Sequence, residues 1–154
     1  MVTDAERRLG CVIELPRGWE SWFDAEAGQL GASAPASAAP PGAFLDQLRV
    51  RREPAGGAGG VEEVVDRVLE GDEDSADLEH FLVLDRGPCE LAGRSGEHVL
   101  AHAYLPGQFA IVLERWFVLA GQDAWTVTGV TPPLVYAVTG PPIEWAALSL
   151  SLAP

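Results

Sequence analysis

The densest hydrophobic pattern lies between Gln108 and Thr131, where two runs of β-branched and aromatic residues are separated by a short segment, residues 120–123. This composition predicts a β-hairpin in the middle of a sheet. Both faces of the first run are mostly apolar, so we expect cover on both sides. If residues 120–124 form the loop, Leu119 pairs with Trp125 and Phe117 with Val127, and one face becomes core. That predicted core face consists of Phe109, Ile111, Leu113, Phe117, Leu119, Trp125 and Val127.

The opposite face of the predicted hairpin mixes apolar bulk with a carboxylate and two hydroxyls, which is typical of a recognition surface. One interpretation is that part of this face, centred on Trp116, binds another protein or a second copy of the chain. The alternative, which we favour, is that a helix covers it. The candidate partner-binding residues are Glu114, Trp116, Val118, Thr126 and Thr128.

Two segments are expected to be helical. Residues 61–70 place valines and a leucine at i, i+3, i+4, i+7 and i+8, which predicts an amphipathic helix that ends at Gly71. Residues 143–152 follow a Pro-Pro pair that suits a helix start. The alternation of Leu148, Leu150 and Leu152 also fits a strand, so both interpretations stay open there.

Shorter apolar runs predict further strands at 11–15, 44–52, 81–91 and 97–105. We expect Trp19, Trp22 and Phe23 to pack as an aromatic group against the sheet. Residues 25–43 are rich in Ala, Pro and Ser, and predict a flexible loop that is poorly ordered over 27–41. The expected architecture is α+β: one domain over residues 1–154, with an antiparallel sheet of about six strands flanked by helices in an α/β/α arrangement.

Composition narrows the class of partner. The chain has 154 residues, 47% of them hydrophobic, and a net charge of −13, which disfavours nucleic acid and anionic membrane surfaces. No run of 18 apolar residues and no apolar segment near the N-terminus is present, so we expect no membrane insertion and a cytoplasmic location. Lys and Asn are absent, as a GC-rich and in our interpretation actinobacterial genome would favour. The two cysteines, Cys11 and Cys89, are expected to be free thiols.

Three segments resemble phosphate-binding or metal-binding motifs, but none has the full pattern. The glycine run at 56–60 is followed by Val61-Glu62-Glu63 and not by the Lys of a phosphate-binding loop. His98 and His102 are four apart, but on a strand they lie about 13 Å from each other, too far for one metal ion. The acidic segment at 72–77 lacks the pattern of a calcium loop. We therefore expect no metal and no cofactor.

Four features together resemble the PsbP-like superfamily. They are Leu15-Pro16-Arg17-Gly18-Trp19, the strand and helix within 44–70, the Leu91-x-Gly93-Arg94-x-Gly96 turn, and the Trp-rich hairpin. This superfamily includes bacterial DcrB and LpqN-type proteins and the yeast nuclear import factor that binds the GTPase Ran. The resemblance implies an antiparallel sheet flanked by helices and a non-catalytic role in binding other proteins.

Three functions remain open at this point. The first is a non-catalytic adaptor or chaperone-like module whose partner is another protein, with a homodimer as an alternative. The second is a carrier of a small apolar ligand in a cavity between sheet and helix, lined by only one or two polar groups. The third is an enzyme, in which Glu114 or Asp123 acts as an acid–base group; this would require a perturbed carboxylate to meet His98 or His102 in one cleft.

Overall fold

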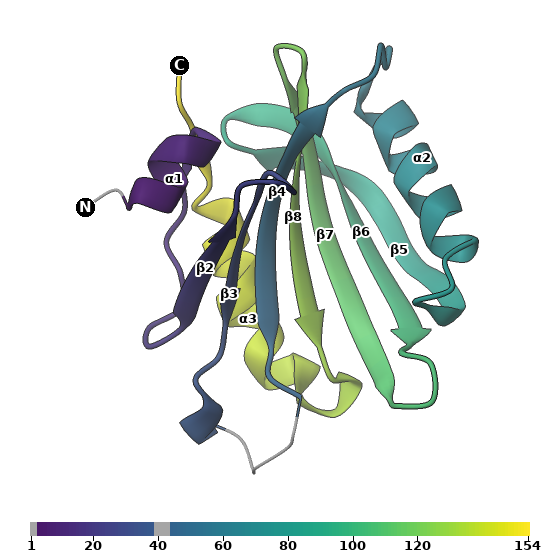
Figure 1. Cartoon of the computed structure of the whole chain (residues 1–154). Helices are drawn as coiled ribbons and strands as arrows, with labels where there is room; N and C mark the ends of the chain where they lie inside the picture. The colour runs from purple at the N-terminus through teal and green to yellow at the C-terminus, as the bar shows by residue number, and fades with distance from the viewer. Residues whose placement is uncertain (1–2, 39–43) are drawn as a thin grey trace.

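The computed structural model of the chain describes residues 3–38 and 44–154 (Figure 1). An antiparallel sheet of seven strands, in the order β2-β3-β4-β8-β7-β6-β5, dominates the fold. This confirms the expected α+β class with an antiparallel sheet and flanking helices. The strands are β2 (Glu20–Asp24), β3 (Gln29–Ser33), β4 (Gln47–Pro54), β5 (Glu79–Leu91), β6 (Arg94–Tyr104), β7 (Ala110–Ala120) and β8 (Asp123–Thr131).

The remaining elements lie around this sheet. A small two-stranded sheet joins the two ends of the chain, because β1 pairs with β9 near the C-terminus. Within residues 3–38 and 44–154, three α-helices and two short 3-10 turns accompany the two sheets. The bounds are β1 (Cys11–Val12), β9 (Ser151–Leu152), α1 (Asp4–Leu9), α2 (Val61–Glu73), α3 (Tyr136–Leu148), η1 (Ala36–Ala38) and η2 (Pro133–Val135).

The β7–β8 hairpin is present as predicted, but its register differs by one residue. The turn consists of Gly121 and Gln122 alone, because Ala120 pairs with Asp123. Gly121 has a φ of 63°, the left-handed conformation that glycine adopts without strain at the first central position of a two-residue hairpin turn.

This register changes which side chains of β7 and β8 share a face. Trp125 pairs with Val118 and Val127 pairs with Trp116, so the predicted pairing of Trp125 with Leu119 and of Val127 with Phe117 was wrong. A shift of one residue moves every side chain of a strand to the other face of the sheet. The two predicted faces of the hairpin are therefore each a mixture of the two real ones.

One face of the sheet, here called the α3 face, carries the larger core. Trp116, Val118, Trp125 and Val127 are buried there in one cluster with Ile143 of α3. The contact with α3 is close at Gly129 of β8, where an added Cβ would lie 2.5 Å from Cγ2 of Ile143. The absence of a side chain at this position lets the helix approach the sheet.

The other face, here called the α2 face, is covered only in part. Val65 and Leu69 of α2 are buried against Val99 of β6 and Phe117 of β7. Helix α2 lies over the β5, β6 and β7 side of the sheet, while α3 lies against β8 on the opposite face (Figure 1). Helix α2 reaches β8 only at one end, where Val64 is buried with Ala124, and the rest of the β4–β8 region of the α2 face is not covered by either long helix.

Helix α3 begins earlier than predicted. It starts at Tyr136, and Pro141 and Pro142, expected to precede the helix, lie inside it. Prolines remove two backbone donors from the helix interior, but both are exposed here, while Gly140, Ile143, Ala146 and Ala147 are buried against the sheet. Burial of that inner side of α3 outweighs the low helix propensity of the two prolines. The strand alternative for this segment survives only at β9.

The expected loop over 25–43 also needs correction. Residues 29–33 form strand β3, which pairs with β2 on one side and β4 on the other. Leu30 and Ala32 are buried on the α3 face, so even a segment poor in large side chains gains enough burial to be ordered when two strands flank it. Residues 34–38 are also described, whereas residues 39–43 lie outside the described part of the chain.

Several boundaries differ in smaller ways. β1 is two residues long, where a strand over 11–15 was expected, and β4 runs from Gln47 to Pro54 instead of 44–52. α2 continues past Gly71 to Glu73. β5 continues through Pro88, which an edge strand tolerates because proline needs no partner for a backbone N–H.

The aromatic group near the N-terminus divides between two faces. Trp19 and Phe23 pack against the main core, as expected. Trp22 is 42% exposed, and its ring lies over Gly31 of β3, where an added Cβ would come within 2.0 Å of it. Cys11 and Cys89 are free, as expected. Within the described residues, no helix is both long and apolar enough to cross a membrane.

Candidate functional site

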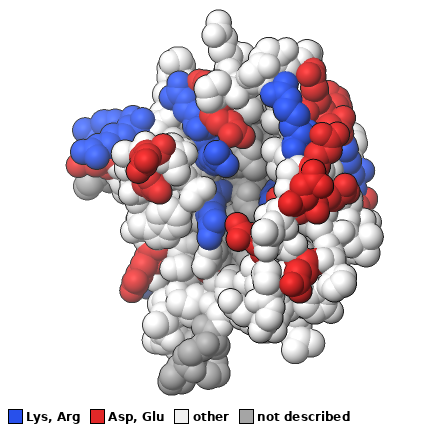
Figure 2. Space-filling view, turned by 45° about the vertical axis from the view of Figure 1, so that its right-hand side comes forward, with Lys and Arg blue, Asp and Glu red and all other residues white. Residues whose placement is uncertain are grey.

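A groove of about 410 Å³ lies on the uncovered part of the α2 face. Its floor is formed by β4, β8 and β7, and one wall by the end of α2 and the segment after it. In the space-filling view, a hollow with arginine atoms along it lies beside the acidic side chains that gather over α2 (Figure 2). This hollow lies where α2 leaves the sheet open.

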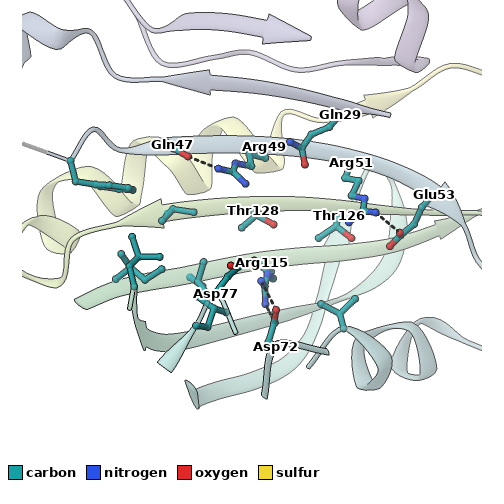
Figure 3. Close-up of a pocket in the computed structure, with 17 residues that line it drawn as sticks. Gln29, Gln47, Arg49, Arg51, Glu53, Asp72, Asp77, Arg115, Thr126 and Thr128 are labelled. Carbon is teal, nitrogen blue, oxygen red and sulfur yellow. Dashed lines mark hydrogen bonds and ion pairs between the residues drawn. The ribbon is translucent and has the colours of Figure 1, made fainter. Parts of the chain in front are cut away.

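The pairing of the strands fixes the order of side chains on the groove floor (Figure 3). Thr128 of β8 lies between Arg49 of β4 and Arg115 of β7, since it pairs with both. Thr126 lies beside Arg51 in the next row. Three arginines and two hydroxyls are thus placed side by side on a rigid, hydrogen-bonded surface, and not on a mobile loop.

One end of the groove is apolar. Its side chains belong to a single cluster in which Ile111, Leu113 and Val130 are buried, and the outer members pack against them. Phe44 meets Phe109 there edge to face, with ring centroids 5.2 Å apart. The apolar lining at this end is Phe44, Leu78, Leu105, Ile111, Leu113 and Val130.

The rest of the groove is polar. Ten of the seventeen lining residues, labelled in Figure 3, are polar or charged. Arg115 donates hydrogen bonds to the carboxylate of Asp72 in α2, one of them over 3.4 Å between Nη2 and Oδ1. Both side chains are largely buried, at 12% and 16% exposed, so this pair ties the α2 wall to the floor.

In the described part of the chain, the other two arginines of the floor are not paired with a buried carboxylate. Arg51 forms an ion pair with Glu53 over 3.3 Å, in which the arginine is exposed and the carboxylate is partly exposed to solvent. Arg49 donates to Oε1 of Gln47 over 2.8 Å, and no carboxylate of the described residues lies within 4.0 Å of its charged nitrogens. Among the described residues, Arg49 is therefore the arginine of the groove floor that has no carboxylate partner.

The five predicted partner-binding residues do not form one surface. Glu114, Trp116 and Val118 are buried on the α3 face, so the expectation that they present an interaction surface was wrong and the covered alternative is correct. Helix α3 and the residues around it occupy that face. Thr126 and Thr128 lie on the other face, in the groove floor.

The enzyme alternative rested on Glu114 or Asp123, and the structure uses both in fixed contacts. One carboxylate oxygen of Glu114 lies 3.2 Å from Nε2 of His98, and the other accepts a hydrogen bond from the hydroxyl of Tyr136. Burial, and then the bond to Glu114, raise the pKa of Tyr136, so the phenol remains a donor. Glu114 and His98 do meet, but both carboxylate oxygens of Glu114 are occupied and its side chain is 8% exposed.

Asp123 and the remaining candidate ligands form no reactive group either. Asp123 is paired with Arg52, with 2.7 Å between Oδ2 and Nη2. His98 and His102 share one face of β6, as expected from their spacing. Among the residues described, no three His, Cys, Asp or Glu side chains are grouped as metal ligands.

Sequence reasoning missed the arginines of the groove, although a signal was present. Gln47, Arg49, Arg51 and Glu53 alternate with the buried Leu48 and Val50, which is the period of a strand with one apolar and one charged face. Phe44 and Leu45, which the predicted strand included, do not fit this alternation, because β4 begins three residues after Phe44.

Comparison with known proteins defines the fold. No protein-family model matches the chain, and no curated protein matches it in sequence. A crystal structure of a Pseudomonas aeruginosa protein of unknown function, PA94, a putative regulator, matches with a TM-score of 0.69 and 18% identity, covering 94% of this chain and 98% of that one. LpqN of Mycobacterium tuberculosis, involved in cell envelope biogenesis, matches with a TM-score of 0.68 and 11% identity over 94% and 83% of the two chains.

A third similar structure is a PsbP protein, after which the superfamily that the sequence resembles is named. It is cyanobacterial PsbP from Synechocystis sp. PCC 6803, with a TM-score of 0.56 and 11% identity over 87% of this chain and 92% of that one. The fold is PsbP-like. At these identities the likeness concerns the fold alone.

Proposed function

We propose that the protein is a non-catalytic binding module, an adaptor or chaperone-like protein, that holds a segment of another protein in the groove of the α2 face. The observation that carries this proposal is the two-part floor: an apolar end beside a row of arginines and hydroxyls, all on paired strands. Interfaces between proteins combine an apolar centre with polar groups at the rim. A rigid floor also lowers the entropy lost on binding.

The candidate acid–base groups support a non-catalytic role. Glu114 and Asp123 are each held in contacts that tie one part of the fold to another. Neither of them lines the groove. The polar groups of the groove are mainly arginines, amides and hydroxyls, which bind and orient but do not titrate near neutral pH.

A carrier of a small apolar ligand is the weaker candidate. Such a site would be enclosed and would contain only one or two polar groups. This groove is open to solvent on one side (Figure 2), and ten of its seventeen lining residues are polar or charged, far more than one or two. The apolar end accommodates a side chain of a partner better than it would hide a whole apolar molecule.

Photo-crosslinking from defined positions tests the proposal. A photoreactive phenylalanine at Gln47, on the groove lining, is compared in native cells with the same residue at Arg94, an exposed residue at the start of β6. We expect a discrete protein adduct from position 47 that is lost when Thr128→Trp fills the groove floor, and no such adduct from position 94. An adduct from position 47 that persists with the Thr128→Trp change, or none at all, contradicts the proposal.

A further inference from the structure

We propose that the groove selects a segment in which an acidic side chain and a large apolar side chain stand two residues apart, with the carboxylate received by Arg49. This inference rests on the proposed function and adds the chemistry that the partner segment must carry. Its basis is the charge and position of three neighbouring rows on the floor.

The first step concerns Arg49. A guanidinium presents several N–H donors in a plane and matches a carboxylate with two parallel hydrogen bonds. Arg49 uses one donor on Gln47 and has no carboxylate within ion-pair distance among the described residues, while Arg115 is already bound to Asp72. A ligand carboxylate at Arg49 would supply the missing counter-charge without breaking an existing pair.

The second step concerns the hydroxyl beside it. Thr128 pairs directly with Arg49 and shares its row on the floor. Among the described residues, no side-chain hydrogen bond involves the Thr128 hydroxyl. A carboxylate bound to Arg49 therefore has a second donor within the same row.

The third step is the spacing to the apolar end. Val130 lies two residues after Thr128 in β8, and it pairs with Leu113 and Gln47, whereas Thr128 pairs with Arg49 and Arg115. Two residues along a strand correspond to roughly 6.6 Å. An extended segment running along the strands would thus place side chains i and i+2 on these two rows, one apolar and one acidic.

The fourth step is the charge of the surroundings. The chain as a whole carries −13, so its surface repels acidic partners in general. On the groove lining, three arginines balance three carboxylates. An acidic side chain is therefore tolerated at this place and disfavoured over the rest of the surface, which adds selectivity.

Two dyes of nearly the same shape test the chemistry. The probe 8-anilinonaphthalene-1-sulfonate (ANS) joins an apolar body to an anion, and N-phenyl-1-naphthylamine is the same skeleton without the sulfonate. We expect ANS to bind the full chain about tenfold more tightly than the neutral dye, and Arg49→Gln to remove this difference, as loss of a charge-assisted hydrogen bond predicts. Arg94→Gln, outside the groove, serves as the matched control and should leave it unchanged.

Two outcomes overturn the inference. If both dyes bind equally, or if Arg49→Gln and Arg94→Gln have the same effect on ANS, the floor does not select an anion beside an apolar group. Failure of ANS to bind at all has the same meaning. None of these results depends on the crosslinking from position 47, so a groove that binds neutral segments would leave the proposed function standing.

Displacement of ANS identifies the source of the carboxylate. Acetyl-Phe-Gly-Glu-amide is compared at millimolar concentration with acetyl-Phe-Gly-Gln-amide and with decanoate. We expect the Glu peptide to displace ANS at a concentration about tenfold lower than the Gln peptide does. If decanoate displaces ANS and neither peptide does, the ligand is a small amphiphile and the assignment to a protein segment is overturned. Equal displacement by both peptides overturns the role of the carboxylate.

Discussion

The hydroxyl of Tyr136, the first residue of α3, donates a hydrogen bond to the buried carboxylate of Glu114 in β7. His98 of β6 contacts the other carboxylate oxygen over 3.2 Å. This contact joins a helix to the middle of the sheet on the side opposite the groove. A buried carboxylate that loses a donor is costly, so the pair stabilises the packing of α3.

Tyr136→Phe tests this relationship. We expect the substitution to lower the free energy of unfolding by about 1–3 kcal/mol, because one carboxylate oxygen of Glu114 is left without its donor. Chemical denaturation measures this change. Tyr104→Phe, at the chain's only other tyrosine, 43% exposed, should change the free energy by no more than about 0.5 kcal/mol. An equal effect at the two positions would refute the stabilising role of the Tyr136–Glu114 contact. A loss of ANS binding in Tyr136→Phe would contradict the assignment of the ANS site to the α2 face.

Two tryptophans distinguish the core from the surface. Trp116 is 2% exposed, whereas Trp145 on the outer side of α3 is 56% exposed. Trp116→Asp removes a large buried side chain and adds a buried charge, a combination that costs more than the roughly 5–15 kcal/mol stability of a typical domain can sustain. We expect Trp116→Asp to be unfolded by circular dichroism.

Trp145→Asp is the control, and it should melt within a few degrees of the unaltered protein because the side chain is already in contact with water. A folded Trp116→Asp protein with an unchanged melting temperature would show that the α3 face is open. The surface first predicted around Trp116 would then have to be reconsidered.

Glu6 gives the expected pH dependence. Burial tends to raise the pKa of its carboxyl, but hydrogen bonds from the backbone N–H groups of Ile13 and Thr3, and from the Thr3 hydroxyl, outweigh burial and hold the pKa below its usual value. A carboxyl with a lowered pKa in the folded state stabilises the protein above its unfolded pKa of about 4.5, and this stabilisation is lost as the pH falls through the lower folded value.

We therefore expect Glu6→Gln to be less stable than the unaltered chain at pH 7, by about 1–3 kcal/mol. The gap should narrow at pH 3, below the unfolded pKa of about 4.5, because the stabilisation from the ionised carboxylate declines as the pH falls toward the lowered folded pKa. Urea denaturation of both proteins at the two pH values measures it. A gap of the same size at pH 7 and pH 3 would mean that the charge of Glu6 contributes nothing.

Much of the fold follows from local patterns. The β7–β8 hairpin, the α2 helix and the antiparallel α+β arrangement are predictable because their apolar periods are long and regular. The PsbP-like likeness is visible in the same features. The hairpin turn was predictable as well, because Gly121-Gln122 has the Gly-X pattern of a two-residue turn. A turn at these two residues gives the observed pairing.

Other parts depend on contacts that a local pattern does not contain. β3 is built from small residues, and its order comes from pairing with β2 and β4 and from burial of Leu30. α3 is helical through Pro141 because its inner side is buried. The groove is the least predictable feature, because it exists where α2 fails to cover β4 and β8, and only the packed structure decides which strands a helix covers.

Amide chemical-shift mapping tests the central claim most directly, namely that the groove of the α2 face is the binding surface. The isotope-labelled full chain is titrated with acetyl-Phe-Gly-Glu-amide, and shifts are followed along the strands and along α3. The account predicts saturable shifts that are largest at Arg49, Thr126 and Thr128 and are reduced in Arg49→Gln. Shifts confined to the outer side of α3, around Val138 and Trp145, or no saturable shifts at all, would contradict it.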